Sequence, residues 1–388
     1  MKVTALAAHT PEAVRAALAA RGWEPHAAWL AASGVQFLLL LLEHISEAER
    51  EALVRWSARA GTDVLTGEGW ALVGGAASRL APLARPDRVP EGLSGFSADL
   101  ARFLAAYAEP SRAWAIAGGE IALDRPVLIG ILNVTPDSFS DGGRFPGLDA
   151  SLAQAERLKA DGCHLLDVGG ESTRPGAALV PDAVERERVV PVVEQLVRRG
   201  LGPVSVDTRK SAVARAAIAA GAGVVNDVSA GAFDAEMLAV AARAGVGMIL
   251  MHMRGTPGTM DAMTTYRHVA FEVAAELRTA AERAEAAGVG AARIVLDPGF
   301  GFAKTSAQNF RLLDELAAVV GLGYPVAVGP SRKRFLGQAT GRPVEDRDRA
   351  TAVSCALAWE RGARLFRVHD VALAREALSI ASATTSPT

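Results

Sequence analysis

The chain has 388 residues with a formal net charge of −2, and 50% of them are hydrophobic, which suffices for one large domain with an extension or for two to three domains. Basic and acidic residues are interspersed, so the sequence does not resemble a nucleic-acid-binding protein. The longest apolar run, Phe37–Leu42, is too short to cross a bilayer, and no signal peptide is indicated at the N-terminus.

The two cysteines, Cys163 and Cys355, lie far apart and have no metal-ligand spacing. Two lone thiols suit a reducing compartment. We therefore expect a soluble cytoplasmic protein that binds neither membrane nor nucleic acid.

Residues 1–110 are predicted to form a small α+β domain. Ser46 and Glu49 have the capping-box spacing that opens a helix. The expected elements, in chain order, are a buried strand over Val35–Leu42, a helix from Ser46 to about Ala60, a strand or hairpin over Asp63–Val73, and a helix over Ser97–Tyr107. No chemical motif occurs in this region, and the sequence does not indicate its role.

Residues 111–388 show a repeated strand-then-helix pattern. A hairpin is expected first, because Gly118 and Gly119 separate two short apolar alternations. Eight short apolar runs follow, each trailed by a helical stretch: Val127–Val134, His164–Val168, Val204–Asp207, Val224–Asp227, Gly247–Met251, Ile294–Asp297, Val326–Val328 and Leu365–Val368. The size and count favour a (β/α)8 TIM barrel. The alternative is an open doubly wound sheet, which the lack of G-x-G-x-x-G after the first run disfavours.

Nearly every run ends in polar residues. In a barrel the reacting groups gather at the C-terminal ends of the strands. Each such residue alone could be a helix N-cap, but the carboxylates lie inside otherwise apolar strands, where an unpaired charge is costly. Asp167, Asp207, Asn226 and Asp297 suit a flat heterocycle rich in N–H donors, whereas Arg174, Lys333, Arg367 and His369 suit a phosphate ester or pyrophosphate.

At these residues the sequence resembles the dihydropteroate synthase family. The motifs that carry the resemblance follow in the family's order: ILNVTPDSFSDGG (131–143), LLDVGGESTRPGA (165–177), VSVDTRK (204–210), NDVSAG (226–231), MHMRGTP (251–257), LDPGFGFAK (296–304), SRKRFLG (331–337) and RVHDV (367–371). The resemblance covers roughly residues 112–385, and nothing is carried over to the first 110 residues.

The resemblance implies a condensation of 6-hydroxymethyl-7,8-dihydropterin pyrophosphate with 4-aminobenzoate, a Mg2+ requirement, inhibition by sulfonamides and a homodimer. Asp207, Asp297, Lys333 and Arg367 would be the catalytic residues. The implied pterin pocket maps to Asp207, Asn226, Asp297 and Lys333, and the pyrophosphate pocket to Asn133, Arg174, Arg367 and His369, with Asn133 holding the metal. The implied 4-aminobenzoate pocket maps to Phe139, Thr173, Pro175 and Ser331.

Some alternatives stay open. Glu171 could be a buried hydrogen-bonding residue or part of the site, and His252 is expected to pack at the pterin wall rather than act as a base. A methyltetrahydrofolate–corrinoid methyltransferase would not need the Lys333, Arg367 and His369 set for pyrophosphate. A catalytically silent pterin-binding paralogue would be expected to have lost its anion pocket.

Overall fold

The computed structural model describes residues 37–43, 45–85, 87, 89–90, 92–108, 111–134, 146–174, 176–177 and 179–385. The chain divides into two compact units, one of residues Met1–Glu109 with Ala383–Thr388 and one of Pro110–Ser382. Val35, Phe139 and Pro175, which the sequence analysis singled out, lie outside the described residues. Among the described residues, no helix is long and apolar enough to cross a membrane.

The first unit is a three-stranded antiparallel sheet with helices. Its strands, in the order β1 (Phe37–Glu43), β3 (Trp70–Ala76) and β2 (Asp63–Gly67), accompany α3 (Glu47–Ala60), α4 (Ala77–Leu80), a 3-10 turn (Ala81–Ala84) and α5 (Ser94–Ala108). The predicted capping box is confirmed, because the Ser46 hydroxyl accepts from the Glu49 N–H while Glu49 accepts from the Ser46 N–H. The predicted hairpin is also confirmed as β2–β3.

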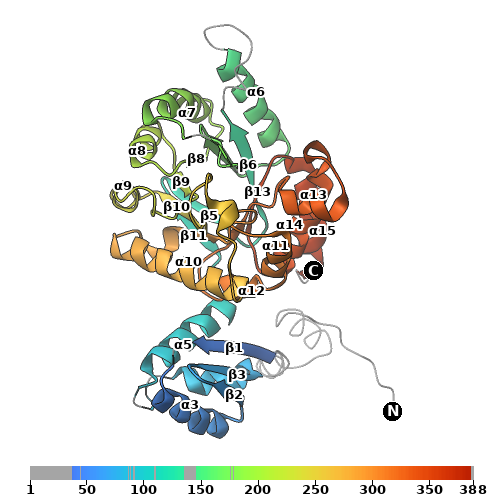
Figure 1. Cartoon of the computed structure of the whole chain (residues 1–388). Helices are drawn as coiled ribbons and strands as arrows, with labels where there is room; N and C mark the ends of the chain where they lie inside the picture. The colour runs from blue at the N-terminus through green and yellow to red at the C-terminus, as the bar shows by residue number, and fades with distance from the viewer. Residues whose placement is uncertain are drawn as a thin grey trace, which may run out of the picture. The chain divides into compact units, whose positions relative to one another are not determined.

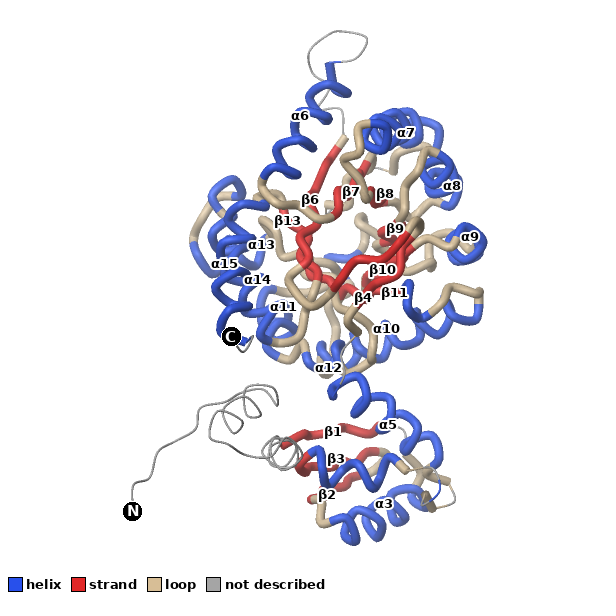
Figure 2. The backbone as a smooth tube through the Cα atoms, turned by 180° about the vertical axis from the view of Figure 1, so that it is seen from behind, coloured by secondary structure: helices blue, strands red, loops and turns tan. Residues whose placement is uncertain are grey.

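The second unit is a closed parallel barrel, and Figure 2 shows its strands as a ring inside the helices. Its eight strands are β6 (Val127–Asn133), β7 (Leu165–Gly169), β8 (Val204–Asp207), β9 (Val224–Asp227), β10 (Gly247–Met251), β11 (Ile294–Asp297), β12 (Ala327–Val328) and β13 (Leu365–Val368). Their order is β11-β10-β9-β8-β7-β6-β13-β12, and a parallel bridge between Leu296 and Val326 closes the ring. The TIM barrel is therefore confirmed, and the open sheet was the wrong alternative.

Successive strand residues face opposite sides, as a pleated strand requires. On β9, for example, Val225 packs with the helices, whereas Val224 lies inside the ring. The helices of this unit are α6 (Pro146–Ala160), α7 (Asp182–Arg198), α8 (Ser211–Ala219), α9 (Met237–Ala244), α10 (Val269–Ala286), α11 (Ser306–Asp314), α12 (Ala317–Val320), α13 (Arg334–Thr340), α14 (Asp348–Glu360) and α15 (Val371–Thr385), labelled in Figure 1.

The predicted hairpin is β4 (Ala113–Ile116) with β5 (Gly119–Ala122), and it plugs the N-terminal end of the barrel. Trp114 is fully buried and packs with Ile116 and the lower inward-facing strand residues. Its indole N–H donates to the Arg293 carbonyl over 2.8 Å. A side chain at Gly247 would collide with Trp114 and Ile116, so glycine is needed there for this close packing. Because this end is filled with apolar groups, a polar site can open only at the opposite end.

Candidate active site

A polar layer lies directly above the apolar plug. On several strands an inward-facing apolar residue of the plug is followed two positions later by a polar residue on the same face: Leu165 by Asp167, Val224 by Asn226, Val295 by Asp297, and Leu365 by Arg367. Asp207 stands beside Asn226 in the strand register. The period of two thus places the polar residues of separate strands at one height, at the C-terminal mouth.

Arg367 is the centre of this layer. Its Nε donates to Asp167 Oδ2 over 2.6 Å, and its Nη2 donates to Asp207 Oδ2 over 2.7 Å. Asp167 is fully buried and also accepts from Asn226 Nδ2 over 3.0 Å. Asp167 was noted from the sequence as an acceptor but was not assigned to the site. The structure shows that it orients both Arg367 and Asn226.

Burial in this layer raises the pKa values of two of its carboxyl groups. Burial raises the pKa of Asp207 to about 7, even though the Arg367 cation opposes the shift. Burial likewise raises the pKa of Asp297 to about 6, against the N–H of Gly299, which donates to Asp297 Oδ1 over 2.7 Å. Strong shifts of this kind, caused by burial and specific charges in one place, are typical of functional sites.

Lys333 faces the same mouth. Its Nζ lies 4.0 Å from the centre of the Phe302 ring, and burial lowers its pKa to about 8. Phe302 belongs to an apolar cluster at the mouth with Val228, Met251, Met260 and Ala303. Gly301 lets the lysine stem pass, since a Cβ there would lie 2.9 Å from Lys333 Cδ, at a φ of +79°. A charged ammonium beside a flat apolar wall suits a polar, planar ligand.

Ser331 and His369 form a second polar pair at the mouth. The Ser331 hydroxyl accepts the His369 backbone N–H over 3.2 Å, and it lies 2.9 Å from His369 Nδ1. The hydroxyl can donate its hydrogen to Nδ1 of the tautomer protonated on Nε2, or accept from the N–H of the other tautomer with its second lone pair. Burial and the Arg332 cation lower the pKa of His369 to about 3, so the ring offers a neutral N–H. The sequence analysis had assigned these two residues to different pockets.

The turn before α13 positions Ser331 and Lys333. Arg332 between them has a φ of +57°, a left-handed conformation that is unusual for a residue with a side chain. Its guanidinium forms a two-pronged ion pair with Asp348, with distances of 2.8 and 2.6 Å. This pair holds the turn in a strained conformation of the kind that is found at functional sites.

Arg174 lies on the loop after β7, and Asn133 ends the adjacent strand β6. The Arg174 cation contributes to lowering the pKa values of both Lys333 and His369. Asn133 lies at the end of β6, and a Cβ built on Gly169 would lie 3.7 Å from Asn133 Oδ1 and 3.6 Å from Asp207 Oδ2. Thr173 is half-buried next to Arg174. The structure thus brings the described members of the three predicted pockets to one mouth.

A buried lysine that the sequence analysis missed supports the β11 loop. Lys304 donates to the carbonyls of Gly299 and Phe302, each over 3.0 Å, and to His252 Nδ1 over 2.9 Å. His252 is buried and its Nε2 lies 3.0 Å from Glu276. Burial lowers the pKa of His252 to about 4, which agrees with a packed, neutral ring. The only sequence signal was a lysine at the end of an apolar motif.

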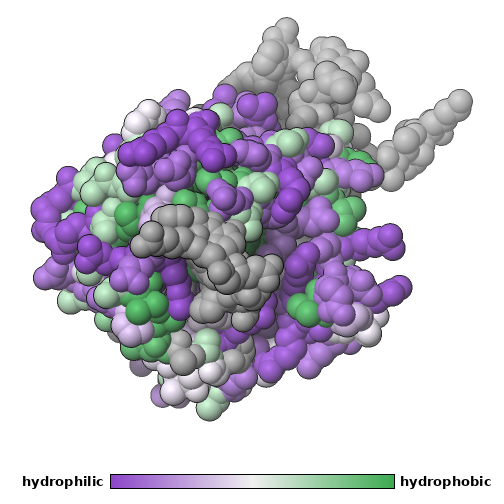
Figure 3. Space-filling model, turned by 90° about the horizontal axis from the view of Figure 1, so that it is seen from above, coloured by the Kyte–Doolittle hydropathy of each residue, from purple (hydrophilic) through white to green (hydrophobic). Residues whose placement is uncertain are grey.

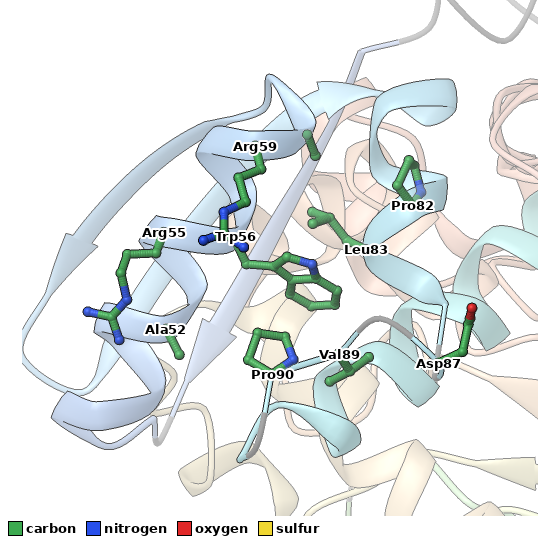
Figure 4. Close-up of a pocket in the computed structure, with 10 residues that line it drawn as sticks. Ala52, Arg55, Trp56, Arg59, Pro82, Leu83, Asp87, Val89 and Pro90 are labelled. Atoms are coloured by element: carbon green, nitrogen blue, oxygen red, sulfur yellow. The ribbon is translucent and has the colours of Figure 1, made fainter.

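The first unit contains a pocket beside Trp56 (Figure 4). It has a volume of about 710 Å3 and is lined by residues of α3 and of the segment around Pro82–Pro90. Arg55 and Asp87 at its edge are paired with Glu51 and Arg85. Its charged lining residues are Arg55, Arg59 and Asp87, whereas acids, an amide and a guanidinium from several strands are linked to one another at the barrel mouth. We therefore place the active site in the barrel.

The described residues at the barrel mouth could supply only one or two ligands to a metal ion. Within the described parts of the chain, no three His, Cys, Asp or Glu residues are grouped so that they could hold an ion. Mg2+ typically takes one or two protein oxygens and completes its shell with water and substrate phosphates. The amide oxygen of Asn133 beside Asp207 fits this mode of binding, with the substrate supplying most of the ligands.

Comparison with known proteins identifies the barrel. Residues 129–369 match the family described as pterin binding enzyme. The dihydropteroate synthase of Mycobacterium leprae is 46% identical over 263 residues, which cover 66% of this chain and 92% of the relative. That of Synechocystis is 43% identical over 260 residues, which cover 67% of this chain and 90% of the relative.

Solved structures of the same family are similar to this chain. The dihydropteroate synthase of Xanthomonas albilineans with 4-aminobenzoic acid superposes with a TM-score of 0.67 at 46% identity, covering 72% of this chain and 100% of that one. The same enzyme in complex with 7,8-dihydropteroate gives a TM-score of 0.65 at 42% identity, covering 71% of this chain and 100% of that one.

Proposed function

The chain belongs to the dihydropteroate synthase family, and we propose that the polar layer of its barrel mouth is where it performs the reaction of that family. The reaction joins 6-hydroxymethyl-7,8-dihydropterin pyrophosphate to 4-aminobenzoate and yields 7,8-dihydropteroate and pyrophosphate. The observation that carries the assignment is the linkage of Arg367 to Asp207 and Asp167, because it places cationic and acceptor groups within one buried layer.

The acceptors of this layer would hold the pterin. The Asp297 carboxylate can accept two N–H bonds from the 2-amino and ring N–H edge, which gives orientation as well as binding energy. Asn226 and Asp207 would take the neighbouring polar atoms. Lys333 would donate to the pterin carbonyl and ring nitrogen, while its neighbour Phe302 would supply an apolar surface beside the ring.

The cations and the neutral histidine would hold the pyrophosphate. Arg174 and the neutral ring of His369, in its Nε2-protonated tautomer, would offer donors at the mouth, and Arg367 can turn one N–H from an aspartate to an incoming anion. Where the donors are already oriented, charge developing on the leaving group is stabilised without reorganisation. Asn133 would hold Mg2+, which supplies further neutralisation of the pyrophosphate when it is bound.

These assignments define what the protein contributes to the chemistry. When pyrophosphate departs, the methylene that remains is a cation stabilised by the electron-rich pterin, and the weak aniline nucleophile then attacks it. The aniline proton becomes acidic only after attack, so no strong base is required beforehand. The residues therefore act mainly by positioning the two substrates and by stabilising charge.

The second substrate would bind above the pterin. Thr173, which is next to Arg174 in the chain, and Ser331, which lies beside His369, would contact 4-aminobenzoate. Phe139 and Pro175 stay predictions for the same pocket. Yersinia pestis dihydropteroate synthase has been solved in complex with a sulfonamide drug. We propose that sulfonamides compete with 4-aminobenzoate in this pocket as well.

A homodimer would form through the outer wall of the barrel. On α14, Val353 and Leu357 are 59% and 39% exposed, and they lie four residues apart on one helical face. Ile380 on α15 is 67% exposed. Hydrophobic residues gathered on one part of a surface mark interaction sites. On the face seen in Figure 3, hydrophilic residues prevail and hydrophobic ones occur in small groups.

A turnover assay tests this proposal against its two rivals. The purified chain is supplied with pterin pyrophosphate, 4-aminobenzoate and Mg2+, and both products are measured. Equal amounts of dihydropteroate and pyrophosphate are expected. A folded protein that binds pterin without turnover would indicate the silent paralogue, whereas methyl transfer from methyltetrahydrofolate to a corrinoid would indicate the methyltransferase.

A further inference from the structure

A buried ammonium joins the two ends of the loop that carries Thr173 and Arg174. Lys210, the residue before α8, donates from Nζ to the Glu171 carboxylate at the start of this loop and to the Val180 carbonyl at its end, the latter over 2.6 Å. It also donates to Glu185 on α7. The side chains of Lys210 and Glu171 are 3% and 7% exposed. Because an ammonium has three N–H donors, these three acceptors satisfy it fully.

Glu171 also forms an ion pair with Arg209. Arg209 Nη2 donates to its other carboxylate oxygen over 2.9 Å, and the Arg209 guanidinium lies 4.3 Å from the centre of the Phe233 ring. The carbonyl of Gly170, one residue earlier, accepts from Arg188 on α7 over 2.9 Å. The start of the loop is therefore fixed by groups from two separate elements.

The four charged side chains form a closed cluster. Lys210 and Arg209 carry two positive charges, and Glu171 and Glu185 carry two negative charges, so the cluster is neutral as a whole. Burial raises the pKa of Glu185, while its hydrogen bond with Lys210 opposes that shift. Removing one partner from such a buried set leaves the opposite charge uncompensated. The four side chains therefore depend on one another for charge compensation, and none of them has been assigned to a substrate.

We propose that Lys210 and Glu171 are positioning residues that fix the base of the loop on which 4-aminobenzoate and the pyrophosphate depend. The inference rests on the proposed function, since Thr173 and Arg174 gain their roles from it. Arg174 on this loop contributes its charge to lowering the pKa values of Lys333 and His369. Between its fixed ends, the loop also donates from the Gly176 N–H to the Pro257 carbonyl over 3.0 Å.

Two matched variants separate positioning from general stability. Glu171→Gln and Glu185→Gln each remove one negative charge from the same cluster while keeping the side-chain shape, but only Glu171 belongs to the loop. Both should lower the Tm by a similar amount. Glu171→Gln should raise the KM for 4-aminobenzoate at least tenfold, whereas Glu185→Gln should leave it within about twofold. The affinity for 6-hydroxymethylpterin, which has no pyrophosphate, should stay within about twofold in both.

Hydrogen–deuterium exchange of the peptide 170–181 gives a readout that does not depend on turnover. Exchange should be faster in Glu171→Gln than in Glu185→Gln. The inference is overturned if both variants raise the KM equally, or if Glu171→Gln leaves the KM and the exchange unchanged.

If wild type fails to turn over, the proposed function fails, and the exchange experiment still decides whether the loop base is fixed in this way. If Glu171→Gln does not fold, Arg209→Lys takes its place, because it weakens the second anchor of Glu171 while conserving charge.

Discussion

The guanidinium of Arg367 donates from Nε to the fully buried carboxylate of Asp167 over 2.6 Å, across the interior of the barrel. The same guanidinium reaches Asp207 on the next strand over 2.7 Å. Arg367, which we propose for pyrophosphate, is therefore bound to Asp207, which we propose for the pterin, and to Asp167, which orients it. On the proposed assignment, an incoming pyrophosphate would compete with Asp207 for Arg367, so that one side chain would contact both halves of the substrate.

This sharing predicts that Arg367→Lys lowers kcat/KM strongly. Lysine keeps the charge but lacks the planar fork that spans two carboxylates. We expect a loss of at least about tenfold, since weakened charge-assisted bonds cost on the order of 1.5–3 kcal/mol. Steady-state kinetics measures the effect. The matched control is Arg364→Lys, because Arg364 precedes the same strand but stacks on Trp359. Equal losses in both variants would contradict the role of Arg367.

The affinity for pterin should depend on pH through Asp297. Its carboxylate must be ionised to accept two N–H bonds, and burial raises its pKa to about 6. In Asp207→Asn, which lacks the other pterin-pocket acid of raised pKa, the association constant should therefore be constant above about pH 7 and fall about tenfold by pH 5, since each unit below the pKa costs about 1.4 kcal/mol. Titration with a pterin analogue between pH 5 and 8 measures the curve. Asp207→Asn should retain the step near pH 6, and an affinity that rises on acidification would refute the assignment.

Asp297→Asn should stabilise the fold at alkaline pH. The folded-state pKa lies above the usual value of 3.8, so the ionised carboxylate destabilises the native protein increasingly as pH rises from about 4 through about 6. The shift from 3.8 to about 6 corresponds to about 3 kcal/mol at most. Asparagine can still accept the Gly299 N–H. Urea unfolding at pH 5 and pH 8 should show a gain for the variant that is larger at pH 8. A variant that is less stable at pH 8 would show that ionisation is not costly there.

The first unit should be dispensable for the chemistry. The matched family region begins at residue 129, and every described residue of the proposed site lies in the second unit. A chain that begins at Ser111 keeps the plugging hairpin and should retain kcat within about threefold. Turnover per folded protein is the measurement. A folded but inactive truncated chain would show that the first unit contributes to the site.

The barrel could be predicted from the sequence because local patterns encode it. Strands such as Val204–Asp207 and Val224–Asp227 have the bounds that were expected, since each is a short apolar run that ends at a polar residue. The strand ends that differ do so by one residue: β6 ends at Asn133 rather than Val134, β7 spans Leu165–Gly169 rather than His164–Val168, and β12 begins at Ala327 rather than Val326. Such shifts arise because strand ends depend on pairing with neighbours rather than on composition.

The contacts between distant residues could not be predicted. Arg367 and Asp167 are 200 positions apart and meet because the strands β13, β6 and β7 are adjacent in the ring. The clamp of Lys210 on Glu171 and Val180 depends on the path of a loop and on the start of a helix. Glu171, for which two roles were open, is buried and paired with Arg209 and Lys210.

The most direct test of the site is a calorimetric titration of wild type and Asp297→Asn with 6-hydroxymethylpterin at pH 8. Wild type should bind, and the variant should lose on the order of 2–5 kcal/mol, about thirtyfold or more in affinity, because an amide cannot accept both N–H bonds of the pterin edge. The stability measurement at the same pH confirms that the variant is folded. An affinity within about threefold of wild type would contradict the placement of the pterin at Asp297.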